Sequence, residues 1–492
     1  MVYGNIEMKS KLNIRRRKWK LQPDPSHVIC RPHIPSGGAC RISSIINRIL
    51  NLSDLEADSL CGHVMLDFSE RHRNLPGILE NNFKLIERHI PEGTELTRSK
   101  KVLLGAYFSM EYSVSAAALF NPSIVPHPDQ ENLGENELRF IMSLRAVGEG
   151  HISSLAFRSG KIREDGSISF DPVSDYVETP MRKLDTHLDK SFFEKRMELC
   201  PDNNTELQNI LGLLPKTFTE NQLYDLLDKV NTEPFSESRT RTIEHIRWLT
   251  ESNYEIDFQK AQGISERVLF PFSPNEKAGI EDARFVQFTD GDETTYYATY
   301  TAYDGNNIFP QLIETHDFSH FKISTFSGKA AKDKGLALFP RKVNGQYVML
   351  GRLDGENNYL MRSDNIHCWS DATLIQTPLE PWEFIQLGNC GSPIETSEGW
   401  LVLTHGVGPM REYSIGAILL DLDAPENVIA RLTTPLLRPH EEEREGYVPN
   451  VVYSCGSLVH RGELYLPYAM SDISCGLISI NLSNLLSAMT KY

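Results

Sequence analysis

A turn-and-strand pattern recurs through the second half of the chain and restricts its fold more than any other feature. Polar turns place their glycines 54, 54 and 63 residues apart, at Asp290-Gly291, Asn344-Gly345, Glu398-Gly399 and Arg461-Gly462. Each turn precedes a short run rich in β-branched and aromatic residues, at 296–303, 346–353, 400–407 and 463–470. Periods of roughly 40 to 50 residues with several strands per unit are typical of β-propeller blades.

A fifth copy of the pattern lies upstream, where 120–125 precedes a polar stretch and the strand-like run 138–147. We therefore predict an all-β core, folded as a five-bladed β-propeller. Between the first two predicted blades, however, residues 180–262 carry helical patterns, with Thr219 as a candidate N-cap. A second helical stretch covers 41–118, with a candidate cap at Ser53.

These patterns divide the chain into five predicted parts. They are a basic arm with an extended segment (1–40), a helical region (41–118), a first blade (119–179), a helical insertion (180–262) and the remaining blades (263–492). Amphipathic helices need a surface on which to bury their apolar face. We expect the two helical parts to cover one edge of a pocket or to form a contact in a homo-oligomer.

Composition narrows the class of partner. The 492 residues contain 50 Lys and Arg against 66 Asp and Glu, a formal charge of -16 that repels phosphate backbones, so nucleic acid is not expected as a ligand. A basic N-terminal arm could contact an anionic surface, but a solvated tail is the simpler interpretation. Neither a signal peptide nor a membrane span is expected.

Cysteine and histidine usage points away from metals and disulfides. The eight cysteines are scattered and form no C-x-x-C pair, which favours reduced thiols in a cytoplasmic protein. No histidine motif has metal-ligand spacing. We expect no metal and no organic cofactor.

The predicted propeller itself nominates a site, because equivalent strand ends meet around its axis. Strand ends supply Arg145, Asp304, Arg352, Asp354, His405 and Asp472. The preceding segments supply Asn121, Glu281, Asp282, Arg284, Lys334, Asn389, Ser392 and Asn450. Carboxylates, cations and amides together suit a ligand with many hydroxyl groups and an anion beside it, so we expect a sugar.

Several ordered segments resemble glycoside hydrolase family 130. They are GIEDARFVQF, KGLALFPRKVNGQYVMLGR, GSPIETSEGWLVLTHGV, IGAILLDLDAPENVIAR and GYVPNVVYSCGS, within a resemblance spanning about 118–485. The resemblance implies a five-bladed propeller that cleaves β-mannosides with inversion of configuration. It also implies that Asp282 is the general acid, acting through a sugar hydroxyl.

An acid that works at neutral pH must keep its proton through burial or a neighbouring carboxylate. Glu281 is the adjacent candidate, although neighbouring side chains on a strand point to opposite faces. Glu281 is therefore also a candidate for binding a hydroxyl or a structural partner.

The resemblance leaves the nucleophile open. Lys334 and His405 match phosphate-binding positions of the family's phosphorylases, and Arg145 and Arg284 match basic strand positions. Asp304, however, stands just after the Y-T-A-Y strand where those phosphorylases carry an arginine, and a carboxylate there would repel phosphate and suit a base that activates water. Glu149 is a second candidate base, with a plain loop glutamate as the simpler interpretation.

These observations favour an inverting hydrolase of β-mannosides, most simply β-1,2-linked manno-oligosaccharides. The first alternative is a β-mannoside phosphorylase that uses inorganic phosphate as co-substrate and releases mannose 1-phosphate. The second is a propeller that binds glycans without chemistry. Asn121, Arg352, Asp354 and Asp472 are assigned as ligands for sugar or phosphate.

Overall fold

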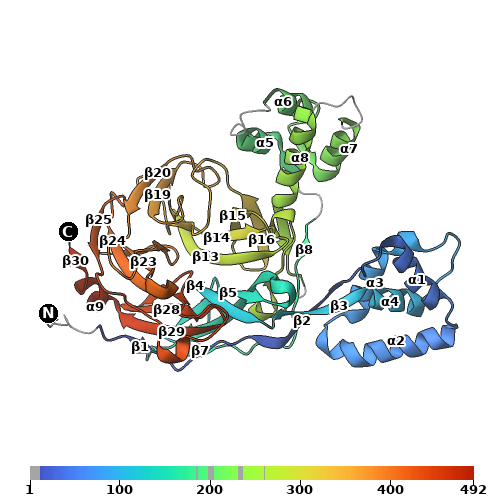
Figure 1. The fold of residues 1–492 in the computed structure, drawn as a ribbon, viewed down its shortest axis with the longest axis horizontal. Coiled ribbons are helices and arrows are strands. Elements are labelled where there is room, and N and C mark those ends of the chain that lie inside the picture. The colour runs from blue at the N-terminus through green and yellow to red at the C-terminus, as the bar shows by residue number, and fades with distance from the viewer. Residues whose placement is uncertain (1–11, 184–186, 198–203, 231–236, 260, 492) are drawn as a thin grey trace.

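A body made mostly of β-strands carries two groups of helices that project from it (Figure 1). The computed structural model describes residues 12–491 except 184–186, 198–203, 231–236 and 260. Residues 1–11 of the predicted basic arm, and Cys200, lie outside the described residues. The strand-rich core predicted from the sequence is confirmed.

Two four-stranded antiparallel runs share the largest sheet. The first run is β4 (Ala118–Pro126), β5 (Leu138–Val147), β6 (Ser153–Ile162) and β7 (Ile168–Phe170). The second run is β13 (Gly279–Asp290), β14 (Glu293–Tyr303), β15 (Ile308–Thr315) and β16 (His320–Thr325). A single parallel pair, Gly279 with Ser153, links the two runs. Short strands extend this sheet at its margins: β8 (Met181–Arg182), β11 (Tyr254–Asp257) and β12 (Val268–Leu269).

Three further sheets follow along the chain. One contains β17 (Ala337–Leu338), β18 (Tyr347–Gly351), β19 (Asn358–Ser363) and β20 (Ala372–Gln376). The next contains β21 (Gln386–Asn389), β22 (Ile394–Thr396), β23 (Gly399–Val407), β24 (Tyr413–Leu420), β25 (Val428–Arg431) and β30 (Thr490–Lys491). The last contains β26 (Val452–Tyr453), β27 (Leu458–His460), β28 (Glu463–Met470), β29 (Ser474–Asn481) and, from the other end of the chain, β1 (Arg15–Arg16).

Buried clusters lie between successive groups of strands. Each cluster combines residues of two groups: Phe157 with Phe285, Val286 with Met349, Leu350 with Val402, Leu403 with Leu466, and Ala469 with Met142. The last of these brings the final group against the first. Since full burial of a large apolar side chain contributes roughly 1.5–3 kcal/mol, these shared clusters hold the groups to one another.

Turn chemistry explains why the strands begin and end where they do. Asn344-Gly345 and Arg461-Gly462 have positive φ at both residues (53° and 82°, 51° and 73°), as two-residue hairpins require. The second of these turns leads into β28, which has the bounds predicted from the sequence.

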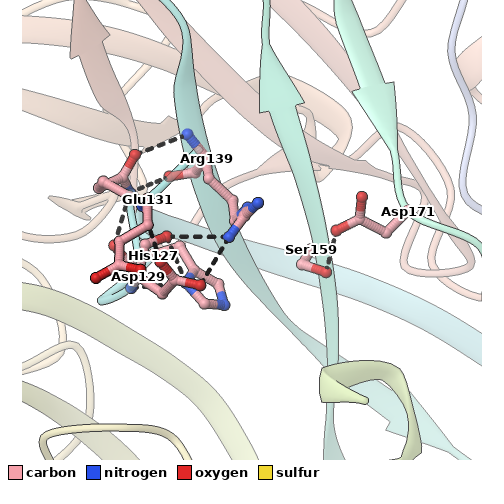
Figure 2. A network of polar contacts seen from close by, with 7 residues as sticks. His127, Asp129, Glu131, Arg139, Ser159 and Asp171 are labelled. Carbon is pink, nitrogen blue, oxygen red and sulfur yellow. Dashed lines mark hydrogen bonds and ion pairs between the residues drawn. The ribbon is translucent and has the colours of Figure 1, made fainter. Parts of the chain in front are cut away.

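A polar network closes the hairpin of β4 and β5 (Figure 2). Arg139 Nη1 lies 2.9 Å from Asp129 Oδ2, and Asp129 N donates to His127 Nδ1 at 2.9 Å. The network holds the end of the hairpin that is remote from Asn121 and Arg145, since six residues of β5 span about 20 Å. It therefore fixes the register of β4 against β5 without contributing to the site described below.

The N-terminal helices stand on a two-stranded ribbon of β2 (Asp24–Pro32) and β3 (Ser109–Ser115) (Figure 1). They are α1 (Gly38–Leu50), α2 (Asp54–Phe68), α3 (Leu75–Lys84) and α4 (Arg98–Tyr107). Ser53 caps α2 as predicted, in a capping box with Glu56. None of the described helices is long and apolar enough to cross a membrane.

The second helical group contains α5 (Lys190–Met197), α6 (Asn204–Gly212), α7 (Glu220–Val230) and α8 (Glu237–Ser252). Thr219 caps α7 as predicted, because its Oγ1 accepts from Gln222 N at 3.3 Å. Strands β9 (His187–Asp189) and β10 (Thr217–Thr219) also lie here, so this stretch is not purely helical. A short C-terminal helix, α9 (Leu482–Ser487), follows β29.

Helix α8 is anchored to the loop that precedes β13. Trp248 Nε1 donates to Asn275 Oδ1 at 2.5 Å, within the short 3-10 helix η5 (Pro274–Glu276). The carboxylate of Glu276 is fully buried and accepts from the hydroxyls of Tyr254 and Tyr300. This network holds the start of β13, the strand that carries Asp282.

Candidate active site

A cavity of about 330 Å³ gathers most of the residues that the sequence nominated. Eight of them line it: Asn121, Arg145, Asp282, Lys334, Arg352, Asn389, His405 and Asp472. They come from different groups of strands, so the fold brings together side chains up to 351 positions apart in the chain.

Asp282 is aimed by a β-bulge. The register of β13 against β14 shifts between Glu281 and Arg284, and Asp282 has a φ of 54°. Left-handed backbone is tolerated best by Gly, Asn and Asp among the residue types, and bulges redirect side chains, which explains an Asp at this position. Its side chain is buried, with 7% of the residue exposed.

Arg145 links two carboxylates. Its Nη2 donates to Glu281 Oε1 at 2.6 Å, and its Nη1 lies 3.3 Å from Asp282 Oδ1. Its Nε donates to Ser153 Oγ at 2.9 Å. Gly279 packs so closely on Ser153 that a Cβ there would lie 2.7 Å from the Ser153 Cβ. This close approach locks the start of β13 against the strand that orients Arg145.

The two adjacent carboxyls have opposite pKa shifts. Burial alone raises the pKa of Asp282, but the cations of Arg145, Lys334 and Arg284 and the hydrogen bond from Asn121 together bring it below its ordinary value. Burial raises the pKa of Glu281, and Arg145 opposes that shift without cancelling it. Asp282 is thus ionised in the free site, whereas Glu281 holds a proton more readily.

Asp472 is a third carboxyl in the cavity. Burial and the nearby charge of Asp282 raise its pKa to about 6, against the opposing effect of Arg145, Arg411 and Lys334. A group with this pKa exchanges its proton close to neutral pH.

His405 presents a neutral imidazole. It is 3% exposed, and its Nδ1 lies 3.2 Å from the backbone oxygen of Asn389, so Nδ1 carries the proton and Nε2 is the free acceptor. Burial, with Arg352 and Arg284 nearby, lowers its pKa to about 3. A side chain at Gly388 would meet the ring, because a Cβ would lie 2.4 Å from His405 Cε1.

The cations differ in how far they are committed to protein partners. Arg284 is buried; its Nη2 donates to Tyr453 Oη at 2.5 Å and its Nη1 to the backbone oxygen of Asp282 at 3.1 Å. Arg352 Nε lies 3.7 Å from Asp333 Oδ2. Lys334 is exposed at the cavity and forms no hydrogen bond or ion pair among the described residues. Cations that retain free donors suit an anionic ligand.

Two predicted site residues lie outside the cavity lining and serve their own turns. Asp304 Oδ1 accepts from the backbone N–H groups of Asn306 and Asn307, at 2.7 and 2.6 Å. Asp354 does the same for Glu356 and Asn357, at 2.9 Å each. These are Asx turns, in which each carboxylate binds its own backbone. The expectation that Asp304 and Asp354 face the cavity is therefore wrong. Glu149 is exposed and also lies outside the lining.

The other nominated residues support the site from its edges. Glu281 and Arg284 contact the lining through Arg145 and Tyr453. Asn389 lines the cavity and donates from Nδ2 to the backbone oxygen of Gly335 at 2.6 Å. Ser392 and Asn450 are not among the lining residues.

Sequence reasoning missed four polar lining residues: Gln386, Arg411, Tyr413 and Tyr453. Two of them have a signal in the sequence. Arg411 and Tyr413 follow the H-G-V strand by a few residues, close to a strand end already assigned to the site. Within the described residues, no group of three His, Cys, Asp or Glu is placed to hold a metal ion.

The chemistry available in this cavity is proton transfer by a carboxyl group that lies close to several cations. A buried carboxylate lies within hydrogen-bond distance of an amide and an arginine, and further cations face the same space. Such a site fits the transfer of a glycosyl group to an anionic or hydroxylic acceptor.

A family model described as beta-1,4-mannooligosaccharide phosphorylase matches residues 238–491. The chain belongs to glycoside hydrolase family 130. This membership confirms the resemblance seen in the ordered motifs.

Curated relatives from this family are named as phosphorylases. The chain is 34% identical over 228 residues to a 1,2-beta-oligomannan phosphorylase of Thermoanaerobacter sp. (strain X514), covering 45% of this chain and 75% of the relative. It is 31% identical over 228 residues to a beta-1,2-mannobiose phosphorylase of Listeria innocua serovar 6a, covering 44% of this chain and 62% of that relative. The protein is thus an enzyme-family member whose relatives act on mannosides.

Among solved structures, the chain matches the beta-1,2-mannobiose phosphorylase of Listeria innocua in complex with beta-1,2-mannobiose. That match has a TM-score of 0.45 and 23% identity, and it covers 77% of this chain and 92% of the other.

Proposed function

We propose that this protein is a β-mannoside phosphorylase that acts on β-1,2-linked manno-oligosaccharides. The observation that carries the proposal is that Lys334, Arg352 and Arg411 line the same cavity as the buried Asp282. The names of the curated relatives support the same activity. The co-substrate is inorganic phosphate, and no step needs a metal.

In the proposed reaction, a phosphate oxygen forms a bond to C1 of the terminal mannosyl unit while the bond from C1 to the glycosidic oxygen breaks. The proton passes to the departing oxygen, which becomes a hydroxyl of the shortened sugar. A single displacement inverts C1, so a β-mannoside yields α-mannose 1-phosphate. Asp282 delivers the proton, directly or through a sugar hydroxyl.

The ionised state of Asp282 fits this sequence if phosphate binds first. Arg145 and Lys334 help to hold its pKa low in the free site. A phosphate dianion placed among these cations offsets their charge and adds negative charge near the carboxylate, and both effects raise its pKa. The bound anion thus promotes uptake of the proton that the leaving oxygen later receives.

Hydrolysis was expected because Asp304 stands where phosphorylases carry an arginine. Asp304 is committed to its own turn and is absent from the cavity lining, so it neither repels phosphate in the cavity nor serves as a base for water. The phosphorylase alternative is therefore favoured over hydrolysis. A binding scaffold without chemistry does not explain why the cavity keeps an ionised acid beside uncommitted cations.

We also propose that the body is the five-bladed propeller expected from the repeat. Five groups of antiparallel strands, separated by shared clusters with the last group against the first, support this architecture. Such an arrangement accounts for strand ends from the whole body lining one cavity.

The test is incubation with β-1,2-mannobiose, with and without phosphate, scoring mannose and mannose 1-phosphate. We expect equal amounts of the two products with phosphate and no turnover without it. Mannose alone, at a rate independent of phosphate, would instead identify a hydrolase. Binding without turnover under both conditions would identify a glycan-binding protein. Asp282→Asn serves as the inactive control, and Asp304→Asn as a matched replacement outside the cavity.

A further inference from the structure

The loop between β23 and β24 has an unusual backbone. It forms the short 3-10 helix η6 (Pro409–Arg411), in which Met410 and Arg411 both have a φ of 58°. Neither residue is among the types that favour left-handed backbone, so two in succession are energetically costly. Strain of this kind persists only where surrounding structure enforces it, and it concentrates at functional sites.

The strained loop delivers a cation to the cavity. Arg411 lines the cavity, with its guanidinium carbon 5.9 Å from the centre of the Tyr413 ring. Among the described residues, no hydrogen bond or ion pair to Arg411 is found. The adjacent acid, Glu412, is paired with Arg438 instead, at 2.8 Å.

Arg411 differs in this respect from Arg145 and Arg284, whose guanidinium groups bind protein partners. Arg145 is committed to Glu281, Asp282 and Ser153, and Arg284 to Tyr453 and a backbone oxygen. The guanidinium of Arg411 keeps all five donors available in a planar fork that matches two phosphate oxygens. Arg411 acts electrostatically on Asp472, and burial disfavours the ionised form of that carboxyl.

We propose that Arg411 is a phosphate-positioning residue, which binds inorganic phosphate and the phosphate group of the sugar 1-phosphate from the mouth of the cavity. This inference rests on the proposed phosphorylase function and adds to it a residue that is not among those nominated from the sequence. Lys334 supplies a second exposed charge to the same anion, and the strained loop keeps Arg411 turned toward the cavity.

The test is Arg411→Asn, because Asn tolerates left-handed backbone while it removes the charge. Initial rates of phosphorolysis are measured against phosphate at saturating β-1,2-mannobiose, and against mannobiose at saturating phosphate. We expect the KM for phosphate to rise at least tenfold and the KM for mannobiose to change less than twofold. In the reverse reaction, the KM for α-mannose 1-phosphate should rise and that for the acceptor should not. Arg411→Lys should recover part of the loss, and Arg438→Ala is the matched control.

The outcomes separate this inference from the function on which it rests. A wild-type enzyme without phosphate-dependent turnover overturns both. Phosphate-dependent wild-type turnover with an unchanged KM for phosphate in Arg411→Asn overturns the role of Arg411 alone. A raised KM for mannobiose with an unchanged KM for phosphate also overturns it, since Arg411 would then bind sugar. Thermal unfolding of Arg411→Asn within about 2 °C of wild type shows that the kinetic change is local.

Discussion

Asn121 Nδ2 donates a hydrogen bond of 2.6 Å to Asp282 Oδ1, although 161 positions separate the two residues. Both have left-handed backbone, with φ values of 48° and 54°, and both lie at register shifts, in β4 and β13. An Asn or Asp in a β-bulge thus occurs on both strands, and the two bulges point these polar side chains at each other. Ser471 and Asp472 repeat the left-handed backbone at the end of β28, with φ values of 47° and 53°.

Two substitutions at Asn121 separate its hydrogen bond from its backbone. Asn121→Gly and Asn121→Ala both remove the donor to Asp282, and we expect each to lower kcat about tenfold, because one hydrogen bond to a charged group contributes roughly 1.5 kcal/mol. Left-handed backbone is energetically costly for Ala but not for Gly. We therefore expect the free energy of unfolding of Asn121→Ala to be roughly 1–2 kcal/mol lower than that of Asn121→Gly. Urea unfolding and steady-state kinetics measure the two effects. Equal stability of the two variants would contradict the bulge assignment.

Asp282→Asn tests the acid. Asn keeps the left-handed backbone and the shape of the side chain, so we expect folding to be retained. It cannot deliver a proton, so we expect kcat to fall by roughly 10²- to 10⁴-fold, while mannobiose still binds. Kinetics and calorimetric titration measure the two properties. Turnover within threefold of wild type would remove Asp282 from the acid role.

Asp304→Ala and Asp354→Ala test the opposite expectation. Each carboxylate accepts backbone N–H groups of its own turn, and neither lines the cavity. We therefore expect each variant to keep kcat and both KM values within threefold of wild type, with a small loss of stability from the weakened turn. A hundredfold loss of turnover in Asp304→Ala alone would restore it as a catalytic base.

Local patterns predicted the strands well. Runs such as Leu138–Val147 and Glu463–Met470 coincide with β5 and β28, because turn chemistry and β-branched side chains act over a few residues. The membership of Asp282, Lys334 and His405 in one cavity was also predictable, since the repeat places Asp282 and Lys334 just before two of its turns and His405 at the end of the strand that follows another.

The direction of a side chain at a strand end was harder to predict. Asp304 and Asp354 were assigned to the site, yet each opens a D-G sequence with an Asn close behind, which is the pattern of a self-capping turn. Arg411 was missed because it reaches the cavity through left-handed backbone at two residues that do not favour it. Propensities describe the common backbone states and therefore give no indication of this one.

The neutral state of His405 predicts how stability responds to acid. Its folded pKa, about 3, lies below the ordinary 6.5, so between these values the unfolded chain takes up a proton that the folded protein does not. The His405 contribution is thus present above pH 6.5 and is lost as the pH falls toward 3. We expect the free energy of unfolding of His405→Gln to depend less steeply on pH in this window.

Nuclear magnetic resonance provides an independent check on His405. We expect no titration of its ring between pH 5 and 8, and an unprotonated Nε2. A midpoint near 6.5 would mean that the imidazole is charged in the working enzyme, contrary to the acceptor role described above.

The raised pKa of Asp472 predicts that its contribution to the free energy of unfolding changes with pH in the direction opposite to that of His405. Its folded pKa, about 6, lies above the ordinary 3.8, so between these values the folded protein holds the proton more tightly than the unfolded chain. Stability from this group is therefore complete below about pH 4 and is lost as the pH rises through 6.

Asp472→Asn removes the penalty of ionising a buried carboxyl. We expect the variant to be more stable than wild type at pH 7 by about 3 kcal/mol and nearly equally stable at pH 4, since one pKa unit corresponds to about 1.4 kcal/mol. Urea unfolding at both pH values measures this difference, with Asp304→Asn as the exposed control. A gain in stability of the same size at both pH values would show that the gain comes from packing and not from the charge. A pH-dependent gain accompanied by a loss of activity would show that the enzyme keeps a destabilising carboxyl for its function.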